Sequence, residues 1–187
     1  LRAELGIEPG RPVILFCAKL ISVKDPATLI RAVGMAKEAN PALLFAGDGA
    51  LRGELETLAA EVAPGLVKFL GFRNQTELPA YYDLCDLFVL PSVFEPWGLV
   101  VNEVMNAAKP VIVSDKIGSG HDLVKPGLNG EVFRAGDAAD LHAKMRPWLR
   151  AAALREQGGA ASRRIINNWG FEQALTGLKA AMSALSS

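Results

Sequence analysis

The sequence predicts an α/β fold, a doubly wound, Rossmann-like parallel sheet of about six strands with helices on both faces. Short apolar runs alternate with segments of helical periodicity along most of the 187 residues. The runs are apolar throughout, as strands buried on both faces are. No internal repeat or second core interrupts the pattern. We therefore expect a single domain over residues 1–187, with a core of about 12–150 and helices over 151–187.

The expected strands are short apolar runs that end at glycine, proline or polar residues. They cover residues 12–17, 42–46, 66–70, 87–90, 110–113 and 131–133. Segments with apolar residues at helical spacing lie between and after them, over residues 26–39, 51–62, 75–84, 99–108 and 137–149. Pro79 favours a short or late-starting third helix, because proline is tolerated only in the first turn.

Two later segments carry separate expectations. Gly118-Ser119-Gly120, after the fifth strand, is expected to form a glycine-rich loop. Near the end of the chain, Phe171, Leu175, Leu178 and Met182 fall on one helical face. The last helix is therefore expected to dock on the domain.

Composition excludes several classes of protein. Lys and Arg number 20, as do Asp and Glu, so the chain lacks the net positive charge of a non-specific nucleic-acid binder. Cys17 and Cys85 lie far apart in apolar runs, and no spacing of ligand residues indicates a metal site. With no signal peptide or membrane-length apolar run, a cytoplasmic protein is expected, and association with a membrane surface stays open. The chain opens on Leu1, which favours a piece of a longer protein.

The loops after the first and fourth strands are the predicted ligand site. In the common doubly wound order these strands are neighbours where the winding reverses, and ligands bind outside their carboxyl ends. The first loop, residues 18–25, holds Lys19 and Lys24, and the second, residues 92–98, holds Glu95. Two cations beside a helix N-terminus suit a phosphate or diphosphate.

The helix that begins near Gly98 and Leu99 carries a second carboxylate, Glu103. An ionised carboxylate accepts paired hydrogen bonds from sugar or ribose hydroxyls, so a sugar nucleotide would satisfy both the cations and the glutamates. Lysines in a loop and glutamates near a helix N-terminus are also commonly just solvated. Both interpretations stay open on the residues alone.

Other chemistries find less support. The turn after the first strand contains no glycine, which argues against the dinucleotide-binding G-x-G-x-x-G, and the three glycines of residues 47–53 are spaced as turn and helix-start glycines. His142 is expected on a helix surface, whereas His121 lies close enough to the predicted site to stay a weak candidate. Two glutamates from one loop–helix unit are poorly placed to flank a scissile bond as a glycosidase pair.

The stretch Glu95–Glu103, which reads EPWGLVVNE, resembles the E-x7-E signature of retaining GT-B fold glycosyltransferases (glycosyltransferase family 4, glycosyl transferases group 1). Further agreement with the family extends over most of residues 12–149, at Gly47-Asp48-Gly49, Phe69-Leu70-Gly71-Phe72, Tyr81-Tyr82, Asp86, Phe88, Pro91-Ser92, Gly127 and Asn129-Gly130. The resemblance implies that this chain is the C-terminal, donor-binding half of a GT-B fold. The N-terminal, acceptor-binding domain would then be a partner outside this chain.

The resemblance also implies roles by position. Lys19 and Lys24 match the basic pair that binds the donor diphosphate and stabilises the leaving group. Glu95 matches the glutamate that contacts the donor sugar, and Glu103 the one that binds the ribose. Transfer in this family is thought to proceed on one face of the sugar, with the departing phosphate helping to deprotonate the acceptor. No metal, cofactor or protein nucleophile is then implied.

Two further contacts follow from the same resemblance. The backbone of Gly98, Leu99 and Val100 would meet the phosphates at the helix start. The turn Gly71-Phe72-Arg73 would lie against the nucleotide base.

The sequence departs from the family pattern in two loops. Lys19 stands where the family usually has Arg, and lysine cannot form a planar two-point clamp on phosphate. Residues 118–122 read GSGHD where the family usually has Gly-Gly and then Pro-Glu. Contacts to the diphosphate and to the donor sugar are therefore expected to differ from the family pattern.

The implied activity is retaining transfer of a hexosyl group from a UDP-, GDP- or ADP-sugar to an unidentified acceptor by the full-length enzyme. The isolated domain is expected to bind nucleotide and to transfer little or nothing. Two alternatives stay open, a non-catalytic nucleotide-sugar-binding module and a GT-B fold sugar epimerase.

Overall fold

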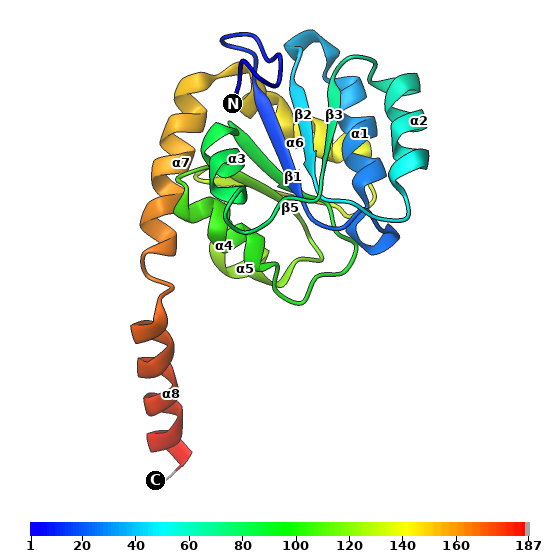
Figure 1. Cartoon of the computed structure of the whole chain (residues 1–187). Helices are drawn as coiled ribbons and strands as arrows, with labels where there is room; N and C mark the ends of the chain where they lie inside the picture. The colour runs from blue at the N-terminus through cyan, green and yellow to red at the C-terminus, as the bar shows by residue number, and fades with distance from the viewer. Residues whose placement is uncertain (186–187) are drawn as a thin grey trace.

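A six-stranded parallel sheet lies between two layers of helices in the computed structural model, which describes residues 1–185 (Figure 1). The strand order is β3-β2-β1-β4-β5-β6, and every neighbouring pair is parallel. The strands are β1 (Val13–Cys17), β2 (Ala42–Ala46), β3 (Val67–Gly71), β4 (Leu87–Leu90), β5 (Val111–Ser114) and β6 (Gly130–Phe133). The predicted α/β fold and the position of all six strands are thereby confirmed.

Helices connect and follow the strands. They are α1 (Pro26–Met35), α2 (Arg52–Val62), α3 (Leu78–Leu84), α4 (Leu99–Asn106), α5 (Gly118–Leu123), α6 (Ala138–Arg150), α7 (Ala152–Ile166) and α8 (Phe171–Leu185), with 3-10 turns η1 (Ser22–Lys24) and η2 (Lys37–Ala39). The expected helix over 26–39 is divided, because the chain leaves α1 at Ala36 and continues as η2. Helix α3 begins late, with Pro79 in its first turn, as the sequence predicts.

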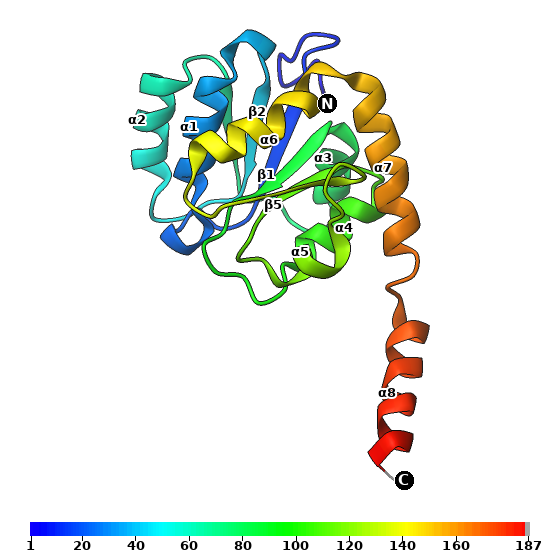
Figure 2. The same ribbon diagram turned by 180° about the vertical axis from the view of Figure 1, so that it is seen from behind.

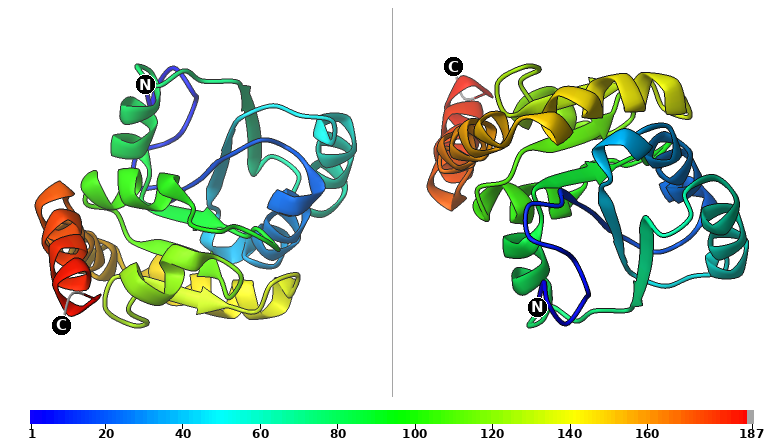
Figure 3. Two further views of the ribbon diagram at one scale, coloured as in Figure 1. Left: turned by 90° about the horizontal axis from the view of Figure 1, so that it is seen from below. Right: turned by 90° about the horizontal axis from the view of Figure 1, so that it is seen from above.

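Alternate residues of each strand build two cores, one on each face of the sheet. Ile14 and Phe16 of β1 face α1, α2 and α6, whereas Val13 and Leu15 face α3, α4 and α7. The helices thus lie in two layers, one on each side of the sheet (Figure 3). Each fully buried side chain of this kind stabilises the fold by about 1.5–3 kcal/mol. Burial on both faces explains why the inner strands β1, β2, β4 and β5 are almost entirely apolar, whereas the partly exposed edge strands β3 and β6 carry Lys68 and Glu131.

The glycine-rich segment after β5 is a helix and not the predicted loop. Residues 118–123 form α5, which places His121 on a helix. A Cβ at Gly118 would lie 2.0 Å from the carbonyl oxygen of Pro96, and one at Gly120 would lie 2.9 Å from a methyl group of Val113. These glycines allow close packing of α5, which a sequence pattern does not distinguish from a flexible turn.

The expectation that the last helix docks on the domain is wrong. Helix α8 extends away from the body beyond α7 (Figures 1 and 2). Leu175, Leu178 and Met182 are 49%, 58% and 61% exposed, and the side chain of Phe171 lies outside the description. Helical periodicity identifies an apolar face but does not supply a surface to cover it. In the part of the chain that the structure describes, no helix is both long and apolar enough to cross a membrane.

Candidate functional site

The winding of the sheet reverses between β1 and β4, so the loops that leave these two strands lie side by side. The backbone N–H of Val93 donates to the carbonyl of Val23 at 2.9 Å, which joins the two loops. The loop after β5 joins them at Glu95, whose N–H donates to Lys116 at 3.1 Å and whose carbonyl accepts from Gly118 at 3.0 Å. Glu95 is therefore held by backbone contacts at the meeting point of three loops.

Lys24 and Glu95 form an ion pair across the reversal point, between Nζ and Oε2. Their side chains are 22% and 16% exposed. Lys24 ends η1, which follows β1, whereas Glu95 lies in the loop that follows β4. The structure thus brings together two of the three predicted catalytic residues in a partly buried, charge-assisted contact.

The N-terminus of α4 adjoins this pair. Gly98 precedes the helix with φ +84°, and no side chain caps the first turn. A Cβ at Gly98 would lie 3.2 Å from the Glu95 side chain and 3.3 Å from those of Leu90 and Ile117. Glycine is therefore favoured here both by the left-handed backbone and by the limited space. The first amides of α4 form the positive end of a helix beside the ion pair.

Glu103 lies one turn further along α4 and is exposed. Its Oε2 accepts a 2.6 Å hydrogen bond from the hydroxyl of Tyr82, which is buried in α3. The Tyr82 hydroxyl also lies 3.8 Å from the sulfur of Cys17 at the end of β1. Burial, and then the hydrogen bond to Glu103, raise the pKa of Tyr82, so the phenol stays protonated as the donor.

Two cavities flank this contact. One, of about 480 Å³, is lined by Cys17, Lys19, Phe72, Arg73 and Leu78 among others. The second, of about 560 Å³, is lined by Leu78 together with Tyr82 and Glu103. Leu78 therefore lines both cavities, the first beside the turn after β3 and the second between α3 and α4.

The turn after β3 contributes an exposed ring and a fixed cation to the first cavity. Phe72 is 77% exposed. Arg73 donates to the carbonyl of Leu70 at 2.8 Å and to Glu77 at 3.2 Å, and its guanidinium lies 5.5 Å from the ring centroid of Tyr81. Backbone contact with Asn74, and then the bond from Arg73, lower the pKa of Glu77. Phe72 rather than Arg73 is thus free to meet a planar ligand.

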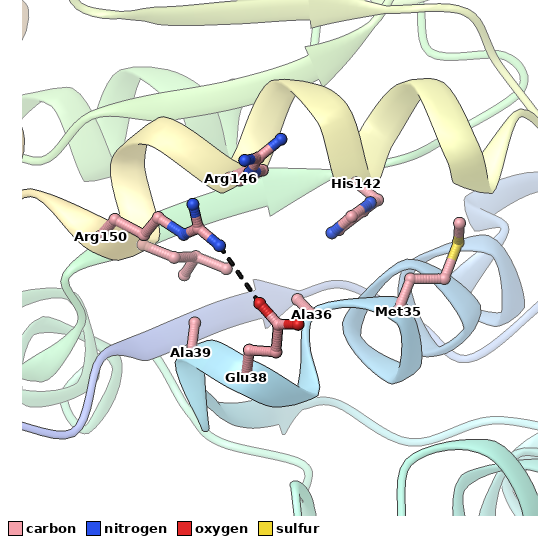
Figure 4. Close-up of a pocket in the computed structure, with 8 residues that line it drawn as sticks. Met35, Ala36, Glu38, Ala39, His142, Arg146 and Arg150 are labelled. Atoms are coloured by element: carbon pink, nitrogen blue, oxygen red, sulfur yellow. Dashed lines mark hydrogen bonds and ion pairs between the residues drawn. The ribbon is translucent and has the colours of Figure 1, made fainter.

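The remaining predicted residues are separate from the ion pair. Lys19 is exposed and lines the first cavity. His121 is exposed on α5 and lines a cavity of about 210 Å³ that shares no residue with the other two. His142 lies on α6 and, with Arg146, lines a cavity of about 290 Å³. Arg150 and Glu38 also line this cavity and form an ion pair of 3.2 Å (Figure 4). That cavity lies between α6 and the end of α1, apart from the loops at the reversal point.

Trp97, inside the loop between the two glutamates, makes one hydrogen bond and one aromatic contact. Its Nε1 donates to Asn102 at 3.0 Å. The ring centroid lies 5.7 Å from that of Trp169, in the turn between α7 and α8. The loop that carries Glu95 thus contacts the base of the projecting helix.

The sequence alone indicates no binding or catalytic role for Tyr82 or Cys17. Tyr82 precedes Glu103 by 21 positions and reaches it from another helix, so no local spacing indicates the contact. Cys17 lies in an apolar run of the sequence, and its half-buried sulfur lies against the Tyr82 hydroxyl. Only the pairing of β1 with β4, and of α3 with β1, brings these groups together.

The sheet order and the ion pair between the loops after β1 and β4 define a doubly wound α/β domain with a candidate ligand site outside the carboxyl ends of its central strands. The sequence pattern of the family described as glycosyl transferases group 1 matches residues 1–165. The chain belongs to this family.

Two relatives illustrate the range of the family. An uncharacterised glycosyltransferase of Methanocaldococcus jannaschii is 37% identical over 131 residues, which are 69% of this chain and 33% of the relative. The sulfoquinovosyl transferase of Arabidopsis thaliana is 31% identical over 175 residues, 92% of this chain and 33% of the relative. The chain therefore spans about a third of the length of these relatives.

Solved structures share the fold over the whole chain. Sucrose-phosphate synthase from Thermosynechococcus elongatus superposes with a TM-score of 0.82 and 28% identity, covering 100% of this chain and 49% of that one. An Anabaena protein solved with UDP and glucose superposes with a TM-score of 0.81 at 24% identity, over 100% of this chain and 51% of that one. The likeness to the second structure shows the fold alone.

Proposed function

We propose that this chain is the donor-binding half of a retaining glycosyltransferase that moves a hexosyl group from a nucleoside diphosphate sugar to an acceptor. The observation that carries the proposal is the Lys24–Glu95 ion pair beside the uncapped start of α4. It puts a cation, a carboxylate and helix amides next to one another. A sugar diphosphate offers a complementary group to each of them. Family membership supports glycosyl transfer in general.

The diphosphate end of the donor is assigned to the cations and the helix start. Lys19 and Lys24, with the amides of Leu99 and Val100, would hold the two phosphates. Glu95 would accept hydrogen bonds from hydroxyls of the donor sugar. Because Glu95 pairs with Lys24 in the structure, sugar and diphosphate would be bound by two side chains that already fix each other.

The nucleoside end is assigned to α4 and the turn after β3. Glu103 would accept from the ribose hydroxyls, and the exposed ring of Phe72, with the turn from Gly71 to Arg73, would lie against the base. The two cavities support this assignment, since Glu103 lines one, Phe72 and Arg73 line the other, and Leu78 lines both. UDP, GDP and ADP are equal candidates for the nucleotide.

In the proposed reaction the bond between the anomeric carbon and the diphosphate oxygen breaks, and the acceptor oxygen bonds to the same face of that carbon. The diphosphate leaves with both bonding electrons, and its phosphate oxygen takes the acceptor proton. Lys19, Lys24 and the helix amides stabilise the charge that develops on the leaving group. The proposed chemistry uses no metal and no protein nucleophile.

The acceptor is assigned to protein outside this chain. The chain spans about a third of its curated relatives and half of the solved neighbour with 28% identity. We propose that a further domain supplies the acceptor contacts, and that the 187-residue chain alone binds donor but transfers little. The free thiols of Cys17 and Cys85 are compatible with the reducing cytoplasm as its location.

Titration calorimetry with UDP-, GDP- and ADP-sugars tests the binding half of the proposal. At least one donor is expected to bind, and Glu103→Ala is expected to weaken binding by about tenfold or more, since a hydrogen bond to a charged group is lost. Glu56→Ala, which removes an exposed glutamate that pairs with Arg52 on α2, is the matched control. The proposal fails if no donor binds, or if Glu103→Ala leaves the dissociation constant of a bound donor unchanged.

A non-catalytic nucleotide-sugar-binding module is the second candidate, and Lys19 is the observation that favours it. An exposed lysine replaces the arginine expected from the family, so the clamp on the leaving group is weaker. A longer protein that contains this chain distinguishes the two. Donor binding without release of nucleoside diphosphate, and recovery of release by Lys19→Arg, would favour the module.

A further inference from the structure

The contact between Tyr82 and Glu103 joins a rigid donor to an exposed acceptor. Tyr82 is only 5% exposed and belongs to α3, which packs on the sheet beside β1. Its hydroxyl is 2.6 Å from Oε2 of Glu103 and 3.8 Å from the sulfur of Cys17. The Glu103 carboxylate is therefore anchored from the interior although its side chain reaches solvent.

The direction of this hydrogen bond is fixed. Burial and the neighbouring carboxylate both raise the pKa of Tyr82, so the phenol keeps its proton at neutral pH. A protonated phenol can only donate to an ionised carboxylate. Oε2 of Glu103 is thus held by the Tyr82 hydroxyl, and both residues line the second cavity.

We propose that Tyr82 is a positioning residue that fixes the Glu103 carboxylate for the ribose hydroxyls and so sets how strongly the site prefers ribonucleotides to deoxyribonucleotides. The inference rests on the proposed function, in which Glu103 meets the ribose. A glutamate on a helix surface otherwise samples several rotamers. Fixing one flexible side chain before binding is worth about two- to tenfold in affinity.

The test measures dissociation constants by calorimetry for UDP, GDP and ADP and for the 2′,3′-dideoxy form of each. For the nucleotide that binds tightest, Tyr82→Phe is expected to raise the dissociation constant of the ribose form about three- to tenfold, and that of the dideoxy form less than about twofold. The preference for ribose then falls, because only the ribose form uses the positioned carboxylate.

Tyr81→Phe is the matched control. It removes the hydroxyl of the adjacent buried tyrosine and keeps the ring that lies beneath Arg73. Both dissociation constants are expected to stay within about twofold of those of the unchanged chain. A fall in ribose preference as large as that of Tyr82→Phe would overturn the inference.

Glu103→Ala shows whether Tyr82 acts through this carboxylate. It is expected to lower the ribose preference by itself, and adding Tyr82→Phe is expected to lower it no further. Equal losses for ribose and dideoxy forms in Tyr82→Phe would mean that Tyr82 supports only the fold, and an unchanged preference would also overturn the inference. Failure of every nucleotide to bind the unchanged chain would overturn the proposed function itself, whereas the other outcomes leave it standing.

Discussion

Single side chains of the site are set by contacts between distant parts of the sequence. Lys24 and Glu95 are 71 positions apart and form an ion pair because β1 and β4 are neighbours. Topology alone predicts their approach, because in the common winding order these two strands flank the reversal point. The Tyr82–Glu103 contact could not be predicted in this way, since it depends on which face of α3 turns towards α4.

Gly98 offers a test of the backbone beside the ion pair. Gly98→Ala is expected to lower the free energy of unfolding by about 1–2 kcal/mol, because an alanine with φ +84° is strained and its methyl group meets Glu95, Ile117 and Leu90. Chemical denaturation measures the change. Gly53→Ala in α2 is the matched control, since a Cβ there meets nothing within 4 Å.

The control is expected to stabilise the chain by up to about 1 kcal/mol, as replacement of glycine inside a helix does. A Gly98→Ala chain that is as stable as the Gly53→Ala chain would show that the turn before α4 relaxes without cost. In that case the backbone beside the Lys24–Glu95 ion pair would tolerate a side chain at this position.

Helices and strands differ in how much of their placement the sequence reveals. The strands are short, largely apolar runs, and all six lie within about a residue of the ranges that the sequence predicts. Helix α5 was missed because Gly118 and Gly120, which allow close packing, have the composition of a turn. Helix α8 was located along the chain but not in space, because its periodicity carries no information about its partner.

The exposed face of α8 leads to a prediction about stability. Leu178→Ala is expected to leave the free energy of unfolding almost unchanged, because Leu178 is 58% exposed. The same substitution at Leu141 of α6, which is fully buried, is expected to cost about 2–5 kcal/mol. Denaturant unfolding of the two variants provides the comparison. Similar losses at both positions would mean that the face of α8 is covered in solution.

The whole molecule is organised by its sheet, and the order of the six strands follows the commonest doubly wound pattern. That order places every loop of the candidate site at one edge. The sequence therefore allows prediction of which loops meet at that edge. It does not allow prediction of the two cavities that share Leu78. One depends on how the loops after β1, β2 and β3 meet, and the other on the packing of α3 against α4.

The pH dependence of global stability follows from the buried thiols. Burial raises the pKa of Cys85 to about 12 and also raises that of Cys17. An unfolded thiol titrates near pH 8.5, so above about pH 8.5 the unfolded chain releases a proton that the folded chain retains. The free energy of unfolding is therefore expected to fall by about 1.4 kcal/mol per pH unit for Cys85 as pH rises from about 8.5 towards 12.

Urea denaturation at a series of pH values between about 8 and 11 measures this dependence, and Cys85→Ala provides the comparison. The variant is expected to be less stable at pH 8 and to lose stability less steeply at higher pH, because it lacks the thiol that titrates. Equal slopes in the two chains would show that Cys85 is not the group responsible.

The contact between Trp97 and Trp169 is expected to give this molecule an intrinsic spectroscopic signal. Two indole rings 5.7 Å apart couple their electronic transitions, and one of them lies two residues from Glu95. The third tryptophan, Trp148, is buried in the core, where its emission reports on unfolding instead. Near-ultraviolet circular dichroism of the unlabelled chain can therefore follow the loop between the two glutamates and the base of α8 in a single signal.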